Sequence, residues 1–266
     1  MAGTEKKSTS YFSFMELGII GLLAVLAVIS GTYVPQYLLA GGDLSGFVYG
    51  TLVLPGPGAG VLVFGSILCF WLILSLLLVQ KPGTAIVISV IVIALNLFIS
   101  GETATIQALD ALLIVAAIIE VLVLLPFGNV PLKYAMPVLM TGLGAITLFL
   151  AITGQAKVGE SGTAATGFPL GYVTIGILAL CYAIVCYRYP VDYFAACAGA
   201  NMYYILHFWL FWGTSFAGRL PVSPDIIPVL FCVTAVGGLL AATGAYGTDL
   251  LCKRYAGHSS GNVRIS

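Results

Sequence analysis

The sequence predicts an all-α fold, a polytopic bundle of about eight transmembrane helices, and three observations lead to it. Apolar residues make up 60% of the 266 residues and charged residues only 8%. The mean hydropathy is +1.09, whereas a soluble domain of this size needs a much more charged exterior. The apolar residues also come in stretches close to the roughly 20 residues that a membrane-crossing helix requires. We therefore expect a multi-pass protein of the cell membrane.

Eight apolar stretches follow one another, separated by polar breaks or breaks rich in glycine and proline. The segments 36–59 and 154–167 are the long connections, each long enough to fold over a site. One stretch, 194–217, contains Asn201 and His207, and an interfacial or re-entrant course is the alternative there. The predicted spans are 14–35, 60–79, 84–100, 106–126, 134–153, 168–188, 194–217 and 226–250.

The distribution of lysine and arginine predicts the orientation. With the N-terminus inside and eight spans, eight of the ten cationic side chains lie on the inner side, and only Lys157 and Arg219 lie outside. A seven-span arrangement would move Lys253 and Arg254 to the outer side. The first apolar run is too long for the core of a cleaved signal peptide. We therefore expect both termini in the cytoplasm and the first run to be a retained span.

Several classes of function lack their chemistry in this chain. The metalloprotease, serine hydrolase and phosphate-binding loop patterns are all missing, so we do not expect an enzyme. A net charge of zero offers no basic surface for nucleic acid. The six cysteines form no Cys-x-x-Cys pair and are expected to be small buried side chains. With one histidine in a span and the other in the tail, bis-imidazole haem ligation is excluded, and we expect no metal or cofactor.

Polar side chains inside apolar spans mark candidate sites, because they are costly in hydrocarbon. Asn96, Gln107 and Asp110 are predicted at similar depth in the outer half of adjacent spans, and the last two share a helical face. Trp71 or Tyr49 is expected to stack on a ligand held there, beneath the loop 36–59. The alternative for Asp110 is a wetted helix N-terminus that the helix dipole favours.

Two further polar residues, Glu120 and His207, interrupt apolar stretches. Glu120 must face the bundle, a cavity or a partner, and a structural hydrogen bond is as plausible for it as ligand contact. His207 stands among aromatic residues, where a hydrogen-bonded packing role is the more common one.

Small residues line one side of the first span, at Ala24, Ala27 and Gly31. Small side chains at such spacing permit close contact between helices, either within the chain or with a partner subunit.

Two stretches resemble the substrate-binding membrane subunits of energy-coupling factor (ECF) transporters, in their YkoE-like branch associated with thiamine or its hydroxymethylpyrimidine precursor. The first begins at Leu54-Pro55-Gly56-Pro57-Gly58, continues through a span with Phe64, Phe70 and Trp71, and reaches Gln80-Lys81-Pro82-Gly83-Thr84-Ala85. The second is the small-small-x-x-Glu patch Ala116-Ala117-Ile118-Ile119-Glu120.

The resemblance implies a six-helix binding subunit over residues 14–188, with its ligand near the outer face under the loop after the first span. Small residues of the first span would contact a shared transmembrane coupling subunit, and two cytoplasmic ATPases would drive transport. The chain departs from the family in two ways. No acidic residue follows shortly after Ala85, and residues 189–252 add two helices beyond the sixth span. Residues 1–13 and 253–266 are expected to be cytoplasmic tails.

These observations favour a substrate-capture subunit of an ATP-driven vitamin importer. The alternative is a non-catalytic integral scaffold subunit of a larger membrane complex, which the missing catalytic residues suit equally well. A self-sufficient secondary transporter would be expected to carry an inverted repeat and broken helices, and no internal repeat is recognisable.

Overall fold

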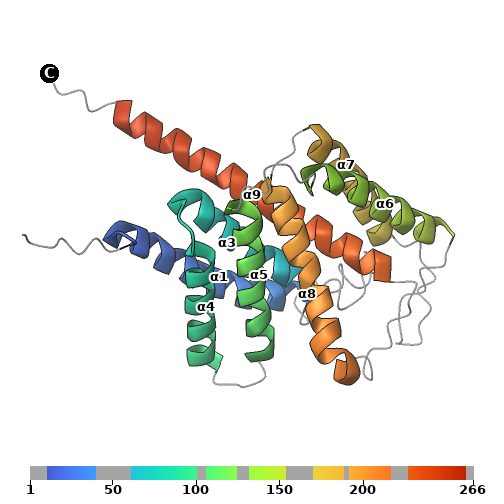
Figure 1. Cartoon of the computed structure of the whole chain (residues 1–266), viewed down its shortest axis with the longest axis horizontal. Helices are drawn as coiled ribbons and strands as arrows, with labels where there is room; N and C mark the ends of the chain where they lie inside the picture. The colour runs from blue at the N-terminus through green and yellow to red at the C-terminus, as the bar shows by residue number, and fades with distance from the viewer. Residues whose placement is uncertain are drawn as a thin grey trace, which may run out of the picture.

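A computed structural model describes residues 11–39, 61–100, 106–124, 132–153, 170–188, 192–216 and 227–261 (Figure 1). The described residues contain helices and turns but no strand, which confirms the all-α prediction. In chain order the helical elements are α1 (Phe14–Leu39), the π-helical turn η2 (Val61–Gly65), α3 (Ser66–Val79), α4 (Thr84–Ser100), α5 (Ile106–Leu124), α6 (Leu132–Ile152), α7 (Leu170–Arg188), α8 (Asp192–Phe216) and α9 (Ile227–Gly261).

Each predicted apolar stretch carries a helix, and most helix ends lie within a few residues of the prediction. The clearest difference is α9, which continues to Gly261 although its apolar stretch was predicted to end at 250. Hydropathy marks where a chain can be in lipid, whereas a helix ends only where its backbone hydrogen bonds stop. The predicted tail 253–266 therefore begins as the last turns of a helix.

Within the described ranges, five helices are long and apolar enough to cross a membrane, which supports a membrane protein. The apolar parts of α4 and α5 are shorter than this length. For α8 the structure describes the side chains of residues 193–207. Eight crossings therefore remain a prediction. The five candidate spans cover Phe14–Pro35, Leu62–Val79, Ala135–Ile152, Leu170–Arg188 and Ile227–Tyr255.

The last helix, α9, lies at the centre of the molecule. It packs against α8, α3, α6, α7 and the turn η2, and the pair α6–α7 reaches the other helices mainly through it. Figure 1 shows α9 passing between α6 and α7 on one side and α3, α5 and α8 on the other. In its most apolar window 67% of the residues are buried, against 28% for α1 and for α6. The two helices predicted as additions to a six-helix core are α8 and α9. They connect α1–α5 with the pair α6–α7.

Small residues explain how α9 can contact so many helices. A side chain at Gly238 would collide with the backbone carbonyl of Cys197 on α8, so the two helices cross in backbone contact. Ala241, Ala242 and Ala245 continue the small surface and are buried. Without a hydrophobic driving force between helices in lipid, such close contact supplies the packing energy.

The small residues of α1 pack against other helices of the same chain. Ala24 and Ala27 are 0% and 1% exposed, and α1 packs against α3 and α4. A Cβ at Gly31 would lie 3.7 Å from the ring of Phe64 in η2. Ala24 and Ala27 are thus covered within the chain, whereas Gly31 is only half-buried, and a partner interface along these residues stays a prediction. The exposed side of α1 carries Leu22, Val25, Leu26, Ile29 and Tyr33.

The eight-span topology predicts opposite locations for two reporters. A fusion at Gly159, in the connection between α6 and α7, should report the outer side, and a fusion at Ser260 should report the cytoplasm. The paired measurement is alkaline phosphatase activity and green fluorescence of the two fusions. Equal locations for both would exclude eight crossings with the N-terminus inside.

The central place of α9 predicts that the first six spans do not fold alone. A chain ending at Arg188 lacks α8 and α9. The pair α6–α7 then loses the helices through which it is connected to α1–α5. We expect this truncation to aggregate or be degraded, whereas removal of residues 262–266 leaves a monodisperse protein. Size-exclusion chromatography of fluorescent fusions measures both. A stable, monodisperse 1–188 fragment would contradict the central role of α9.

Candidate functional site

The turn between α3 and α4 is built from Gln80-Lys81-Pro82-Gly83. Gln80 ends α3 in the left-handed conformation, at φ 55°, and its N–H bonds to the Leu76 carbonyl at 3.0 Å. Gly83 has φ 83°, a conformation that glycine adopts without strain. The Thr84 hydroxyl donates to the Lys81 carbonyl at 2.7 Å. These local interactions turn the chain back and start α4.

The carboxylate of Glu120, on α5, binds the N-terminus of α4. Its Oε2 accepts the N–H of Gly83 at 2.9 Å, and its Oε1 accepts the N–H groups of Ala85 at 2.5 Å and Ile86 at 3.3 Å. The first N–H groups of a helix have no partner within the helix, and their dipoles favour a negative charge. Glu120 supplies both an acceptor and that charge, from a residue 34 to 37 positions away in the chain.

This contact explains how a carboxylate is tolerated in an apolar helix. Glu120 is 6% exposed, and burial of an unpaired charge there would be strongly unfavourable. Three backbone donors satisfy its two oxygens. Of the two roles predicted for Glu120, the structure shows the structural hydrogen bond.

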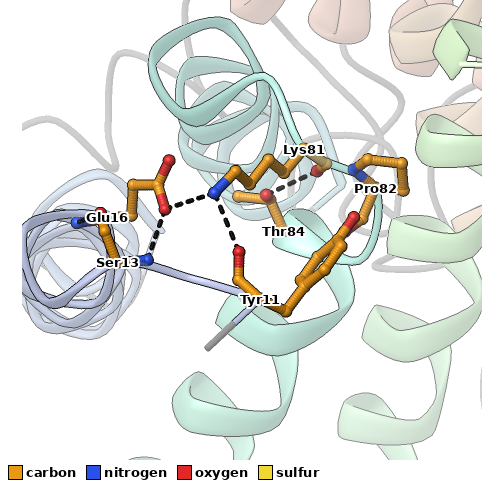
Figure 2. A network of polar contacts seen from close by, with 6 residues as sticks. All are labelled: Tyr11, Ser13, Glu16, Lys81, Pro82 and Thr84. Carbon is orange, nitrogen blue, oxygen red and sulfur yellow. Dashed lines mark hydrogen bonds and ion pairs between the residues drawn. The ribbon is translucent and has the colours of Figure 1, made fainter. Parts of the chain in front are cut away.

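The same turn is held from the other side by α1, as Figure 2 shows. The Lys81 ammonium donates to the Glu16 carboxylate at 2.7 Å and to the Tyr11 carbonyl at 2.9 Å. The Tyr11 hydroxyl donates to the Pro82 carbonyl at 3.3 Å. The rings of Tyr11 and Phe12 lie 5.8 and 5.9 Å from the Lys81 nitrogen, within cation–π range.

Glu16 is positioned for Lys81 by the start of α1. The Ser13 N–H donates to Glu16 Oε2 at 2.6 Å, and the Glu16 N–H donates to Ser13 Oγ at 3.3 Å. This reciprocal pair is the capping box of a helix N-terminus, Ser-x-x-Glu in sequence. Two carboxylates hold the turn between α3 and α4: Glu16 binds its Lys81 side chain, and Glu120 binds its backbone. We call these contacts the turn clamp. The turn clamp fixes the ends of α1, α3, α4 and α5 to one another.

The predicted binding residues lie away from the turn clamp. Asn96 is near the end of α4, while Gln107 and Asp110 are in the first turns of α5. Figure 1 shows these two helices side by side, with these ends together. The structure thus brings the three positions to one end of the α4–α5 pair, opposite Glu120. The side chains of Gln107 and Asp110, and all of Tyr49, lie outside the described residues.

Two predicted ligand contacts have partners within the protein. The Asn96 amide donates to the Val92 carbonyl at 2.9 Å. The Trp71 indole N–H donates to Ser30 Oγ of α1 at 2.7 Å, and its ring meets Phe70 edge-on, with centroids 4.9 Å apart. Trp71 therefore joins α3 to α1, and ligand stacking by it stays a prediction.

His207 is 1% exposed within α8. The Tyr203 hydroxyl and His207 Nδ1 are 3.2 Å apart, and the two rings are 5.7 Å apart. This arrangement fits the packing role expected from the sequence.

One buried polar residue was missed from the sequence, and so was the partner of another. Asp249 on α9 is 1% exposed, and its Oδ2 accepts from Lys253 at 2.7 Å. The spacing of four residues was a usable signal for this ion pair. Asn201 on α8 is fully buried and donates to the Thr234 carbonyl of α9 at 2.8 Å. Its polarity was visible in the sequence, but its partner on another helix was not.

Among the residues that the structure describes, no three histidine, cysteine or acidic side chains come together as a metal site would require. Comparisons of the chain with protein-family profiles, curated proteins and solved structures find no match.

Removal of the Glu120 carboxylate should destabilise the protein. Glu120→Ala leaves the first N–H groups of α4 buried without acceptors, which costs about 1–3 kcal/mol. Glu120→Gln, which keeps one oxygen acceptor, should lose less. Thermal unfolding in detergent measures both, with Glu16→Gln as the control for the exposed side of the turn clamp, where a surface ion pair contributes little. A Glu120→Ala variant as stable as the parent would refute the capping role.

Proposed function

We propose that this chain is a membrane-embedded substrate-capture subunit of an ATP-driven importer, and that its substrate is a small vitamin-like heterocycle such as thiamine or its pyrimidine precursor. One observation carries the proposal. The two sequence stretches that resemble ECF substrate-binding subunits, the Lys-Pro-Gly turn and the small-small-x-x-Glu patch, meet in direct hydrogen bonds.

The resemblance therefore concerns residues with one shared physical task. Gly83 supplies a backbone N–H and a left-handed conformation, and Glu120 supplies the carboxylate that binds it. The left-handed φ of 83° favours glycine at this position, since a side chain there would strain the turn. The contact gives the two stretches a shared structural role and is the support for the resemblance of the α3–α5 region to that family.

The proposed ligand pocket is at the end of the α4–α5 pair opposite the turn clamp. Asn96, Gln107 and Asp110 are gathered there by the backbone. The turn clamp fixes the other end of α4 to α5 and α1. These helices can therefore support a binding site rigidly. The loop predicted over 36–59 contains Tyr49, and we propose that its part beyond α1, from residue 40 on, closes over the ligand.

A coupling subunit, if it docks on α1, would meet the exposed apolar side rather than the small residues. Leu22, Val25 and Ile29 are 60%, 44% and 48% exposed on that side. An apolar helix face in a membrane protein contacts either lipid or another membrane protein. The proposal assigns it to the coupling subunit when the importer is assembled.

The pocket predicts that Asp110→Ala weakens ligand binding by about 1–3 kcal/mol, or roughly 5- to 150-fold, because a buried ligand group loses its charged partner. The measurement is calorimetric titration of the purified protein with thiamine, hydroxymethylpyrimidine and related heterocycles. Asp249→Asn is the matched control, since Asp249 is a buried carboxylate on α9 that pairs with Lys253 one turn along the same helix. Equal loss in both variants would point to damaged folding rather than a lost contact.

The scaffold alternative gives a different result. If no heterocycle binds while the chain co-purifies with a membrane complex that lacks an ATPase, the capture proposal is refuted. Co-purification with an ATPase pair and binding of a heterocycle together support it.

A further inference from the structure

A group of polar side chains is buried where the turn η2, the start of α3, α8 and α9 meet. We call it the buried polar cluster, and its members are Cys69, Cys197, Asn201, Tyr204 and Thr234, each fully or almost fully buried. Cys197, Asn201 and Tyr204 follow one another at intervals of four and three residues, so they share one face of α8. The cluster is separate from the turn clamp and from the proposed ligand pocket.

The side-chain amide of Asn201 is fixed in orientation but only half satisfied. Its Nδ2 donates to the Thr234 carbonyl at 2.8 Å. Its Oδ1 then faces Gly65, the last residue of η2, so closely that a Cβ at position 65 would collide with it. This buried oxygen has no hydrogen-bond donor among the described residues.

The hydroxyl of Tyr204, one turn along the same face of α8, is in the same situation. It is buried and has no hydrogen-bond partner in the described part of the chain. The Tyr204 ring also packs against Gly65, where a Cβ would lie 3.3 Å from its Cδ2. Cys69 lies near this hydroxyl and near Cys197.

Two unpaired polar atoms on one helix face require a partner, because an unsatisfied polar group inside a membrane protein is costly. The chemistry of the cluster limits what that partner is. The cluster contains no carboxylate, and the buried acids Glu120 and Asp249 have partners elsewhere, so a cation would stay uncompensated. The close contacts of Gly65, Gly237 and Gly238 with their neighbours limit any occupant to a molecule much smaller than a heterocycle.

We propose that one ordered water molecule binds in the buried polar cluster, donating to Asn201 Oδ1 and hydrogen-bonded to the Tyr204 hydroxyl. Water is the smallest molecule that offers both a donor and an acceptor, and buried waters characteristically satisfy two to four such groups. The neighbouring π-helical turn fits this assignment, since such turns are frequent at functional sites of helical proteins. The water site stands independently of the proposed transport function.

The test is a double-mutant cycle read as melting temperature in detergent. Tyr204→Phe and Asn201→Leu should each lower the melting temperature, by about 2 °C or more for a protein of this size. The double variant should lose less than the two single losses combined, because the first substitution already removes the bridge. The matched control is Tyr172→Phe, which removes another buried hydroxyl without a partner among the described residues, but on α7. Its effect on the melting temperature should add to that of Asn201→Leu, because the two sites share no bridge.

Three outcomes overturn the proposal. If Tyr204→Phe is as stable as or more stable than the parent, the hydroxyl has no bridge to lose. If sodium stabilises the parent but not Asn201→Leu, compared with choline at equal ionic strength, the site holds a cation. If the variants do not fold, a map of the parent protein that resolves ordered solvent decides instead, and a lack of density within hydrogen-bond distance of both atoms refutes the water.

Discussion

The contact on which the described fold depends is the one between a carboxylate and the start of a helix. Glu120 completes the hydrogen bonds of α4 from the neighbouring helix α5, and Lys81 joins the same turn to α1 through Glu16. In an apolar solvent, packing alone distinguishes poorly between helix arrangements. A leucine side chain makes equally favourable contacts with lipid and with another leucine. A charge that can be satisfied in only one place selects one register. The turn clamp therefore determines how α1, α3, α4 and α5 are arranged, and it does so at one end only.

The rest of the described fold depends on small residues. Along α9 the glycines that contact α8 and α3 let the helices approach closely, beside the hydrogen bonds that join Thr234 to Asn201 and Thr243 to Tyr182. The result is a molecule in two parts, α1–α5 with α8 and the pair α6–α7, joined by the final helix of the chain. The helices predicted as additions to a six-helix core are thus the ones that hold the two parts together.

The sequence was sufficient to predict the helices, because hydropathy and glycine or proline breaks are local signals. It also singled out Glu120 as a residue that needed a partner, and the Lys-Pro-Gly turn as a distinctive element. What it could not supply was the pairing between them, or between Asn201 and Thr234, since pairing depends on which helices are neighbours in space. The same limit explains the assignment of Ala24 and Ala27 to a partner surface. A stripe of small residues predicts close contact but not with which helix, and here the contact is within the chain.

The length of α9 has a mechanical consequence. Its 35 residues extend about 52 Å at 1.5 Å per residue, while the hydrocarbon core of a bilayer is about 30 Å thick. Even with some tilt, a continuous helix of this length reaches from the middle of the protein into the water beyond the headgroups. Its final turns carry the exposed side chains of Leu251, Lys253 and Tyr255. A helix is stiff along its axis. A displacement of those turns would therefore also move the part of α9 that joins the two parts of the molecule.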